Sequence, residues 1–193
     1  MDINWIVNRT KNILLTPRTE WPIIAGEKAA HAQVTTSWLL PLSLISVAAA
    51  FIGYGFIGYS IGGIHFASVS LGIRQAVLQL VVIIGGAYIT AHIINALAER
   101  YASEKNLDQA FSLVAYACAP ACLGGFLQII PSLASIGSLA GLYSLYLLYL
   151  GLPSMMKTPP EKNTGYCVMV LLCAVGVFLV LGILLGAILM RAW

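Results

Sequence analysis

Long apolar segments separated by short polar stretches dominate this 193-residue chain. A helix needs about 20 mainly apolar residues to cross the hydrocarbon core of a bilayer. The pattern therefore predicts an all-α membrane protein, a five-span helical bundle over residues 34–193 that follows a cytoplasmic amphipathic segment at residues 1–33. The expected spans lie at about residues 37–58, 74–97, 109–130, 133–152 and 165–190.

Composition supports this class. Hydrophobic residues make up 60% of the chain and charged residues 9%, whereas soluble domains carry about a quarter charged residues. The spans leave no room for a separate soluble catalytic domain. Basic residues are not interleaved with exposed aromatics, so the expected partner is the lipid bilayer and not nucleic acid. The first 33 residues lack a signal-peptide pattern, which predicts that the first span is an uncleaved anchor.

The distribution of basic residues predicts the orientation, because short loops rich in Lys and Arg stay in the cytoplasm. Eight of the ten basic residues fall on one side of the expected spans, and the acidic residues share that side. The amino terminus is then cytoplasmic and the carboxyl terminus outside. The charged inner face is a candidate surface for protein partners; alternatively, the asymmetry only sets the direction of insertion. The eight are Arg9, Lys11, Arg18, Lys28, Arg100, Lys105, Lys157 and Lys162.

Residues 3–15 have the periodicity of an amphipathic helix that ends before Pro17. A helix with a basic polar face opposite an apolar face suits the inner headgroup layer. Arg9 and Lys11, with Trp21 as an interfacial anchor, are candidate contacts with the membrane surface. Packing of this segment under the bundle is an equally supported alternative.

Residues 54–73 are rich in glycine and aromatic residues. They are too apolar for an ordinary solvated loop. Two interpretations stay open: a segment in the outer interface, or one that dips into the bilayer beside a cavity.

The second expected span carries the strongest set of intramembrane polar groups. Tyr88, His92, Asn95 and Glu99 follow one another at steps of four, three and four residues, so they share one stripe of a helix. Ionisable groups inside a span are functional candidates by default. The stripe indicates either a proton or solute pathway, or polar groups that bond neighbouring helices and hold the bundle together.

The third expected span contains Tyr116 and Pro120, which complete the candidate intramembrane polar site. Proline cannot donate its backbone amide, so Pro120 leaves the Tyr116 carbonyl unbonded and predicts a kink there. Cys118 and Cys122 lie one turn apart, but without a C-x-x-C pair or a second nearby histidine we expect no metal site. The cysteines are expected to be free thiols. No catalytic motif is present, so neither enzyme activity nor a cofactor is expected.

Small residues in the last two expected spans indicate close helix packing. Gly137 and Gly141 form one G-x-x-x-G pattern, and Gly182 and Gly186 form a second. Small residues at this spacing let helices approach closely. The pattern is compatible with a homo-oligomer but does not identify a dimer face.

Three pieces of the chain carry a family resemblance: Pro17 with Glu20-Trp21; Ala115-Tyr116 to Pro120 with Ile130-Pro131; and Tyr143 to Pro153, followed by Lys157 and Lys162. In these pieces the sequence resembles the Yip (Ypt-interacting protein) domain family, in its bacterial inner-membrane branch. The resemblance implies five spans with a cytoplasmic amino terminus. The chain lacks the Asp-Leu-Tyr-Gly-Pro pattern of eukaryotic members, so their binding of Rab-type small GTPases and their role in vesicle traffic are not carried over.

Two functions follow from these observations. The first is a non-enzymatic scaffold or membrane-organising protein that binds partners through its cytoplasmic face. The second is a small ion or solute channel or transporter that uses the polar stripe of the second span.

Overall fold

The computed structural model describes residues 3–191, except the side chains of residues 61, 178 and 180–191. Within this part, four helical segments are long and apolar enough to cross a membrane. The expectation of a multi-pass helical membrane protein is therefore confirmed. The four segments are His31–Ile57, Val69–Tyr101, Leu107–Ile129 and Pro131–Met156.

The first of these segments joins several helical pieces. α3 (His31–Val34) continues through a π-helical turn, Thr35–Leu39, into α4 (Leu40–Ile52) and a second π-helical turn, Gly53–Ile57. The expected first span, residues 37–58, falls inside this segment except for its last residue, Gly58.

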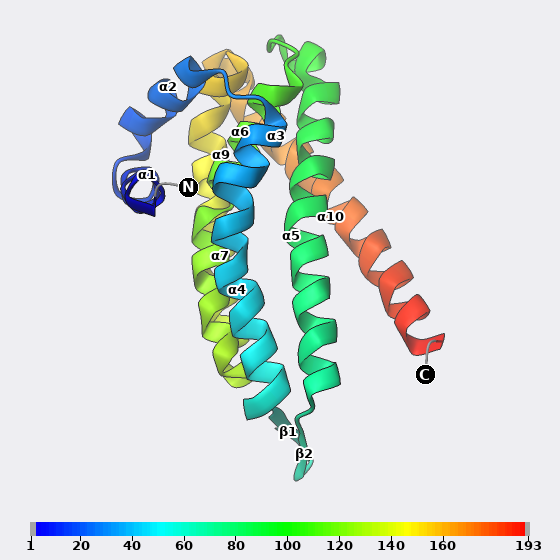
Figure 1. Cartoon of the computed structure of the whole chain (residues 1–193). Helices are drawn as coiled ribbons and strands as arrows, with labels where there is room; N and C mark the ends of the chain where they lie inside the picture. The colour runs from blue at the N-terminus through cyan, green and yellow to red at the C-terminus, as the bar shows by residue number, and fades with distance from the viewer. Residues whose placement is uncertain (1–2, 192–193) are drawn as a thin grey trace.

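A short antiparallel hairpin follows. β1 (Tyr59–Ile61) pairs with β2 (Ile64–Phe66). Gly62 and Gly63 form its tip with φ of +59° and +83°, a left-handed conformation that glycine adopts without a steric penalty. Figure 1 shows the hairpin at the end of the bundle, beyond α4 and α5. Residues 54–73 thus finish one helix, form the hairpin and begin the next helix, and they do not turn back between the helices.

α5 (Val69–Leu97) runs the length of the bundle and ends in a 3-10 turn, Ala98–Tyr101. Its first turn is capped by Ser68, whose hydroxyl accepts a hydrogen bond from the Leu71 N–H at 3.1 Å. The predicted second span, residues 74–97, therefore lies within a longer helix.

The third membrane segment is broken where Pro120 predicts a kink. One residue, Cys118, separates α6 (Leu107–Ala117) from α7 (Ala119–Gly124). A 3-10 stretch, Gly125–Ile129, completes the segment. Pro120 lies in the first turn of α7, where a missing backbone N–H costs no helical hydrogen bond. The expected break in this span is confirmed.

The last helices return along the bundle and then diverge from it. A 3-10 turn, Pro131–Leu133, and α8 (Ala134–Ser138) lead into α9 (Ala140–Met156). α10 (Pro160–Arg191) contains the expected fifth span and leans away from α5 in Figure 1. Many of its side chains lie outside the described residues, so the fifth crossing stays a prediction.

One of the two G-x-x-x-G patterns, Gly137 with Gly141, lies among the described side chains. A Cβ added at Gly137 would lie 2.3 Å from the backbone oxygen of Gly124, whereas one added at Gly141 would meet nothing within 4 Å. Gly137 therefore allows α8 to approach α7, and Gly141 has no packing role within the described residues. Gly182 and Gly186 belong to the part of α10 whose side chains are outside the description.

Two amino-terminal helices complete the fold. α1 (Ile3–Leu15) has the bounds of the helix expected at residues 3–15, and α2 (Pro17–Glu27) follows after Thr16. Figure 1 shows both at one side of the bundle, towards the end opposite the β-hairpin. Ile13, Trp21 and Ile24 belong to the same buried core as side chains of α6 and α9. α1 and α2 thus pack as part of the bundle.

Candidate functional site

A buried charged cluster lies between α1 and α2. Arg9 donates a hydrogen bond from one guanidinium nitrogen to Glu20 Oε1 at 2.6 Å, and the other nitrogen is paired with Glu27. The side chains of Arg9 and Glu20 are only 7% and 6% exposed. We call Arg9, Glu20 and Glu27 the Arg9 cluster. The cluster joins α1 to α2, and removal of one partner would leave a buried charge unpaired.

Aromatic rings surround the guanidinium group of Arg9. Its central carbon lies 5.3 Å from the ring centroid of Trp5 and 5.8 Å from that of Tyr116. Both distances are within the range of cation–π attraction. Trp38 packs between them, 5.9 Å from Trp5 and 4.7 Å from Tyr116 between ring centroids. The cluster therefore joins the amino-terminal helices to the first and third membrane segments.

Electrostatics keep Arg9 charged. Burial alone would lower the pKa of its guanidinium group, but the hydrogen bond to Glu27 and the charges of both glutamates raise that pKa above its ordinary value. Arg9 therefore holds its proton.

The Arg9 cluster lies along the sides of the membrane segments and away from the charged ends of those segments. Its neighbour Tyr116 lies about 14 Å along the α6 axis from Leu107, the first residue of that helix, at about 1.5 Å per residue. On the neighbouring helix, the Tyr143 hydroxyl donates a hydrogen bond to the Leu14 carbonyl oxygen at 2.6 Å. By the same rise, Tyr143 is about 20 Å along the α9 axis from Met156, the last residue of that helix. α1 thus lies beside the membrane segments and not beyond their ends.

α2 is held by a second set of contacts. The Trp21 side chain is 1% exposed and packs against α9 at Gly151. The Gln109 side-chain amide donates a hydrogen bond to the Ala25 carbonyl oxygen at 3.1 Å. Both contacts come from residues at or near the ends of α6 and α9, so they fix α2 across that end of the bundle.

Two of the three candidate membrane-surface residues are buried against the protein. The ion pairs bury Arg9, and the contact with α9 buries Trp21, as the alternative of packing under the bundle expects. Lys11 is exposed, so of the three candidates it alone presents its side chain to the surroundings.

The polar stripe of α5 does not converge on one site. The Tyr88 hydroxyl lies 3.0 Å from Thr35 Oγ1, and its ring packs on Phe111 at 4.5 Å between centroids. His92 is exposed, and Glu99 pairs with Lys105 at 3.5 Å. The oxygen of the half-buried Asn95 amide has no hydrogen-bond partner among the described residues. Tyr88 therefore bonds helix to helix, and the four groups form no connected chain.

One polar contact was not foreseen from the sequence. Asp108 Oδ1 accepts a hydrogen bond from the His31 backbone N–H at 2.9 Å and lies 2.6 Å from His31 Nδ1. Asp108 thereby pairs a free backbone N–H in the first turn of α3 and joins that helix to the start of α6. The two residues are 77 positions apart, so no spacing rule could pair them.

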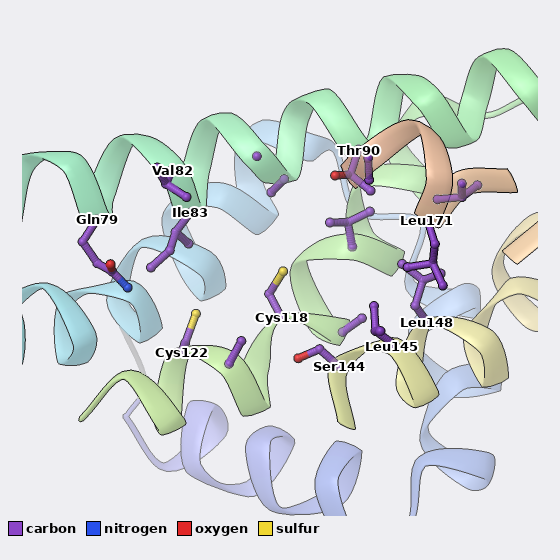
Figure 2. A pocket seen from close by; sticks show the side chains of 17 residues that line it. Gln79, Val82, Ile83, Thr90, Cys118, Cys122, Ser144, Leu145, Leu148 and Leu171 are labelled. Atoms are coloured by element: carbon purple, nitrogen blue, oxygen red, sulfur yellow. The ribbon is translucent and has the colours of Figure 1, made fainter. Parts of the chain in front are cut away.

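An apolar cavity of about 240 Å³ lies between α5, α6, α7, α9 and α10. In Figure 2, the thiols of Cys118 and Cys122 point towards it, and Gln79 and Thr90 line it from α5. The Ser144 hydroxyl is buried at its wall without a partner among the described residues. The cavity has few polar groups and no charged side chain, which suits an apolar occupant.

Metal ligands are not grouped in the described part of the chain, where no set of three or more His, Cys, Asp or Glu side chains could hold an ion. The four cysteines are free thiols.

Comparison with known proteins identifies one family. No curated protein and no solved structure matched the chain. A family model described as the Yip1 domain matches residues 11–185, which includes the last turn of α1, all of α2 and all four described membrane segments. The match thus covers all three pieces on which the sequence resemblance depends, which lie within residues 17–21, 115–131 and 143–162. This multi-pass membrane protein belongs to the Yip1 domain family.

Proposed function

We propose that this protein is a non-enzymatic, membrane-organising scaffold that binds protein partners through one charged, cytoplasmic end. One observation carries the proposal: exposed charged side chains occupy the segments where α9 ends and α10 begins and the 3-10 turn after α5. Figure 1 shows these segments together at one end of the bundle. We call this set the charged end. It comprises Lys28, Glu99, Arg100, Glu104, Lys105, Lys157, Glu161 and Lys162.

The backbone under the charged end is well ordered by hydrogen bonds. The Glu104 N–H donates to the Met156 carbonyl oxygen at 2.8 Å, and the Ser103 hydroxyl donates to Thr158 Oγ1 at 2.9 Å. The side chains above them stay exposed; the Lys157–Glu104 pair, at 2.7 Å, is a surface pair that contributes little stability. A fixed backbone with exposed charges of both signs suits specific recognition, because less entropy is lost on binding.

The channel alternative has less support. His92 and Glu99 are exposed while Tyr88 bonds Thr35, so the stripe offers no continuous polar path. The cavity between α5 and α10 is lined mainly by apolar side chains, which favours an apolar occupant over a hydrated ion.

Site-specific photo-crosslinking in intact membranes tests the scaffold proposal. A photoreactive residue would replace Lys105 or Glu161 at the charged end, and Ile64 in the β-hairpin as the control. The proposal expects the same discrete adducts from Lys105 and Glu161 and none from Ile64. The adducts formed from the probe at position 161 should disappear in Lys105→Glu/Lys162→Glu and persist in Arg74→Glu, a charge reversal at the opposite end. Adducts of equal pattern from Ile64, or none from either charged-end position, would overturn it.

A further inference from the structure

A hollow of about 270 Å³ opens between α1 and α2 beside the Arg9 cluster. We propose that it binds the headgroup of a zwitterionic phospholipid with a primary ammonium group, of the phosphatidylethanolamine type. This inference is independent of partner binding at the charged end. The hollow is lined by Trp5, Asn8, Arg9, Asn12, Glu20 and Ile23.

The charge of the cluster favours an ammonium group. Arg9 carries one positive charge and faces the two carboxylates of Glu20 and Glu27, so one negative charge is left over. Glu20 is only 6% exposed at its side chain, so water screens that excess poorly. An ammonium group in the hollow would neutralise it.

The opposite wall favours the phosphate of the same headgroup. Asn8 and Asn12 are exposed residues one turn apart on α1, so their side chains share a face of that helix. Each side-chain amide carries two N–H donors, which suit phosphate oxygens. Donors on one wall and a carboxylate on the other match a zwitterion better than a simple cation or anion.

The surroundings of the hollow favour a lipid over a soluble molecule. Ile3, Val7, Leu15 and Ile23 are 71%, 58%, 70% and 54% exposed on the two helices. α1 also lies beside the membrane segments, through the contacts of Leu14 with Tyr143 and of Trp5 with Trp38. Acyl chains would cover these apolar side chains while the headgroup occupies the hollow.

Native mass spectrometry of the full chain in detergent tests the proposal. The protein would be titrated with phosphatidylethanolamine, phosphatidylcholine or phosphatidylglycerol, and with soluble phosphoethanolamine. The proposal expects phosphatidylethanolamine to bind best. Asn8→Leu/Asn12→Leu should weaken that binding about tenfold, the equivalent of one charge-assisted hydrogen bond. Gln33→Leu changes an exposed amide on α3, away from the hollow, and should leave binding unchanged.

A second variant tests the charge argument without disturbing the ion pairs. Ile23→Lys places an ammonium group of the protein itself at the hollow and should abolish the preference for phosphatidylethanolamine. Val7→Lys, an equally exposed position that does not line the hollow, should retain it. Equal binding of the three lipids, or an unchanged preference in Ile23→Lys, would overturn the proposal. Soluble phosphoethanolamine binding as tightly as the lipid would overturn the assignment to a membrane lipid.

Discussion

At the scale of single residues, Arg9 shows how the partner of a side chain decides its position. The helical periodicity of α1 is correct, and it places Arg9 on the polar side of that helix. The sequence offers no rule that pairs Arg9 with Glu20 and Glu27, which are 11 and 18 positions away. Pairing with both carboxylates offsets the cost of removing Arg9 from water, so a residue expected at the membrane surface is buried.

Arg9→Met keeps a long side chain but removes the charge, leaving Glu20 buried and unpaired. We expect a loss of about 3–5 kcal/mol in the docking of α1 and α2. Hydrogen exchange of these helices in nanodiscs would report it as faster exchange over residues 3–27 with little change in α5. Lys11→Met, at an exposed position of the same helix, should change stability by no more than about 0.5 kcal/mol. Equal exchange in both variants would contradict the role of the Arg9 cluster.

At the scale of elements, packing between α2 and α9 depends on one glycine. A Cβ at Gly151 would lie 2.4 Å from Leu113 Cδ1 and 2.8 Å from the Trp21 ring. The sequence showed Gly137 and Gly141 as a packing pattern and gave no such signal for Gly151. Local spacing identifies small residues, but only the docking of α2 determines which of them a neighbour touches.

Gly151→Ala should displace Trp21 or Leu113 and destabilise the fold by about 1–3 kcal/mol, the usual cost of overpacking a core. Gly141→Ala, on the same helix with no atom within 4 Å of the added Cβ, should be neutral or stabilising by up to about 1 kcal/mol, because alanine favours helix. Thermal unfolding in one detergent would compare the two. A Gly151→Ala protein as stable as Gly141→Ala would show that α2 does not pack against α9 as described.

At the scale of the whole molecule, charge and apolar segments decide how the chain lies in the membrane. Apart from Lys11, Arg18 and Glu27, the described exposed charges that were expected inside belong to the charged end. The β-hairpin, beside which Arg74 lies, is at the other end of the bundle (Figure 1). The cytoplasmic location of the amino terminus stays a prediction. Four crossings would return the chain to the inner side, and the predicted fifth crossing through α10 would place the carboxyl terminus outside.

Single cysteines in a variant lacking the four native cysteines would map this topology. A cysteine at Lys28 or Lys162 should react with an impermeant maleimide only after the membrane is opened. A cysteine at Ile64 or appended at the carboxyl terminus should react in intact cells or right-side-out vesicles. Labelling of the carboxyl terminus only after opening would show that α10 does not cross, and inverted labelling at Lys28 and Ile64 would contradict the orientation.

The sequence by itself determined that the chain is a helical membrane protein, where the described spans lie, that Pro120 interrupts the third, and which family the chain resembles. These properties depend on local hydropathy and backbone chemistry, which each segment carries without its neighbours. The tertiary structure decided that Tyr88, His92, Asn95 and Glu99 have separate surroundings and form no single site. It also decided that His31 binds Asp108, and that α1 and α2 pack against the bundle around the Arg9 cluster. Each of these outcomes depends on contacts between residues far apart in the chain, whose energies no single segment contains.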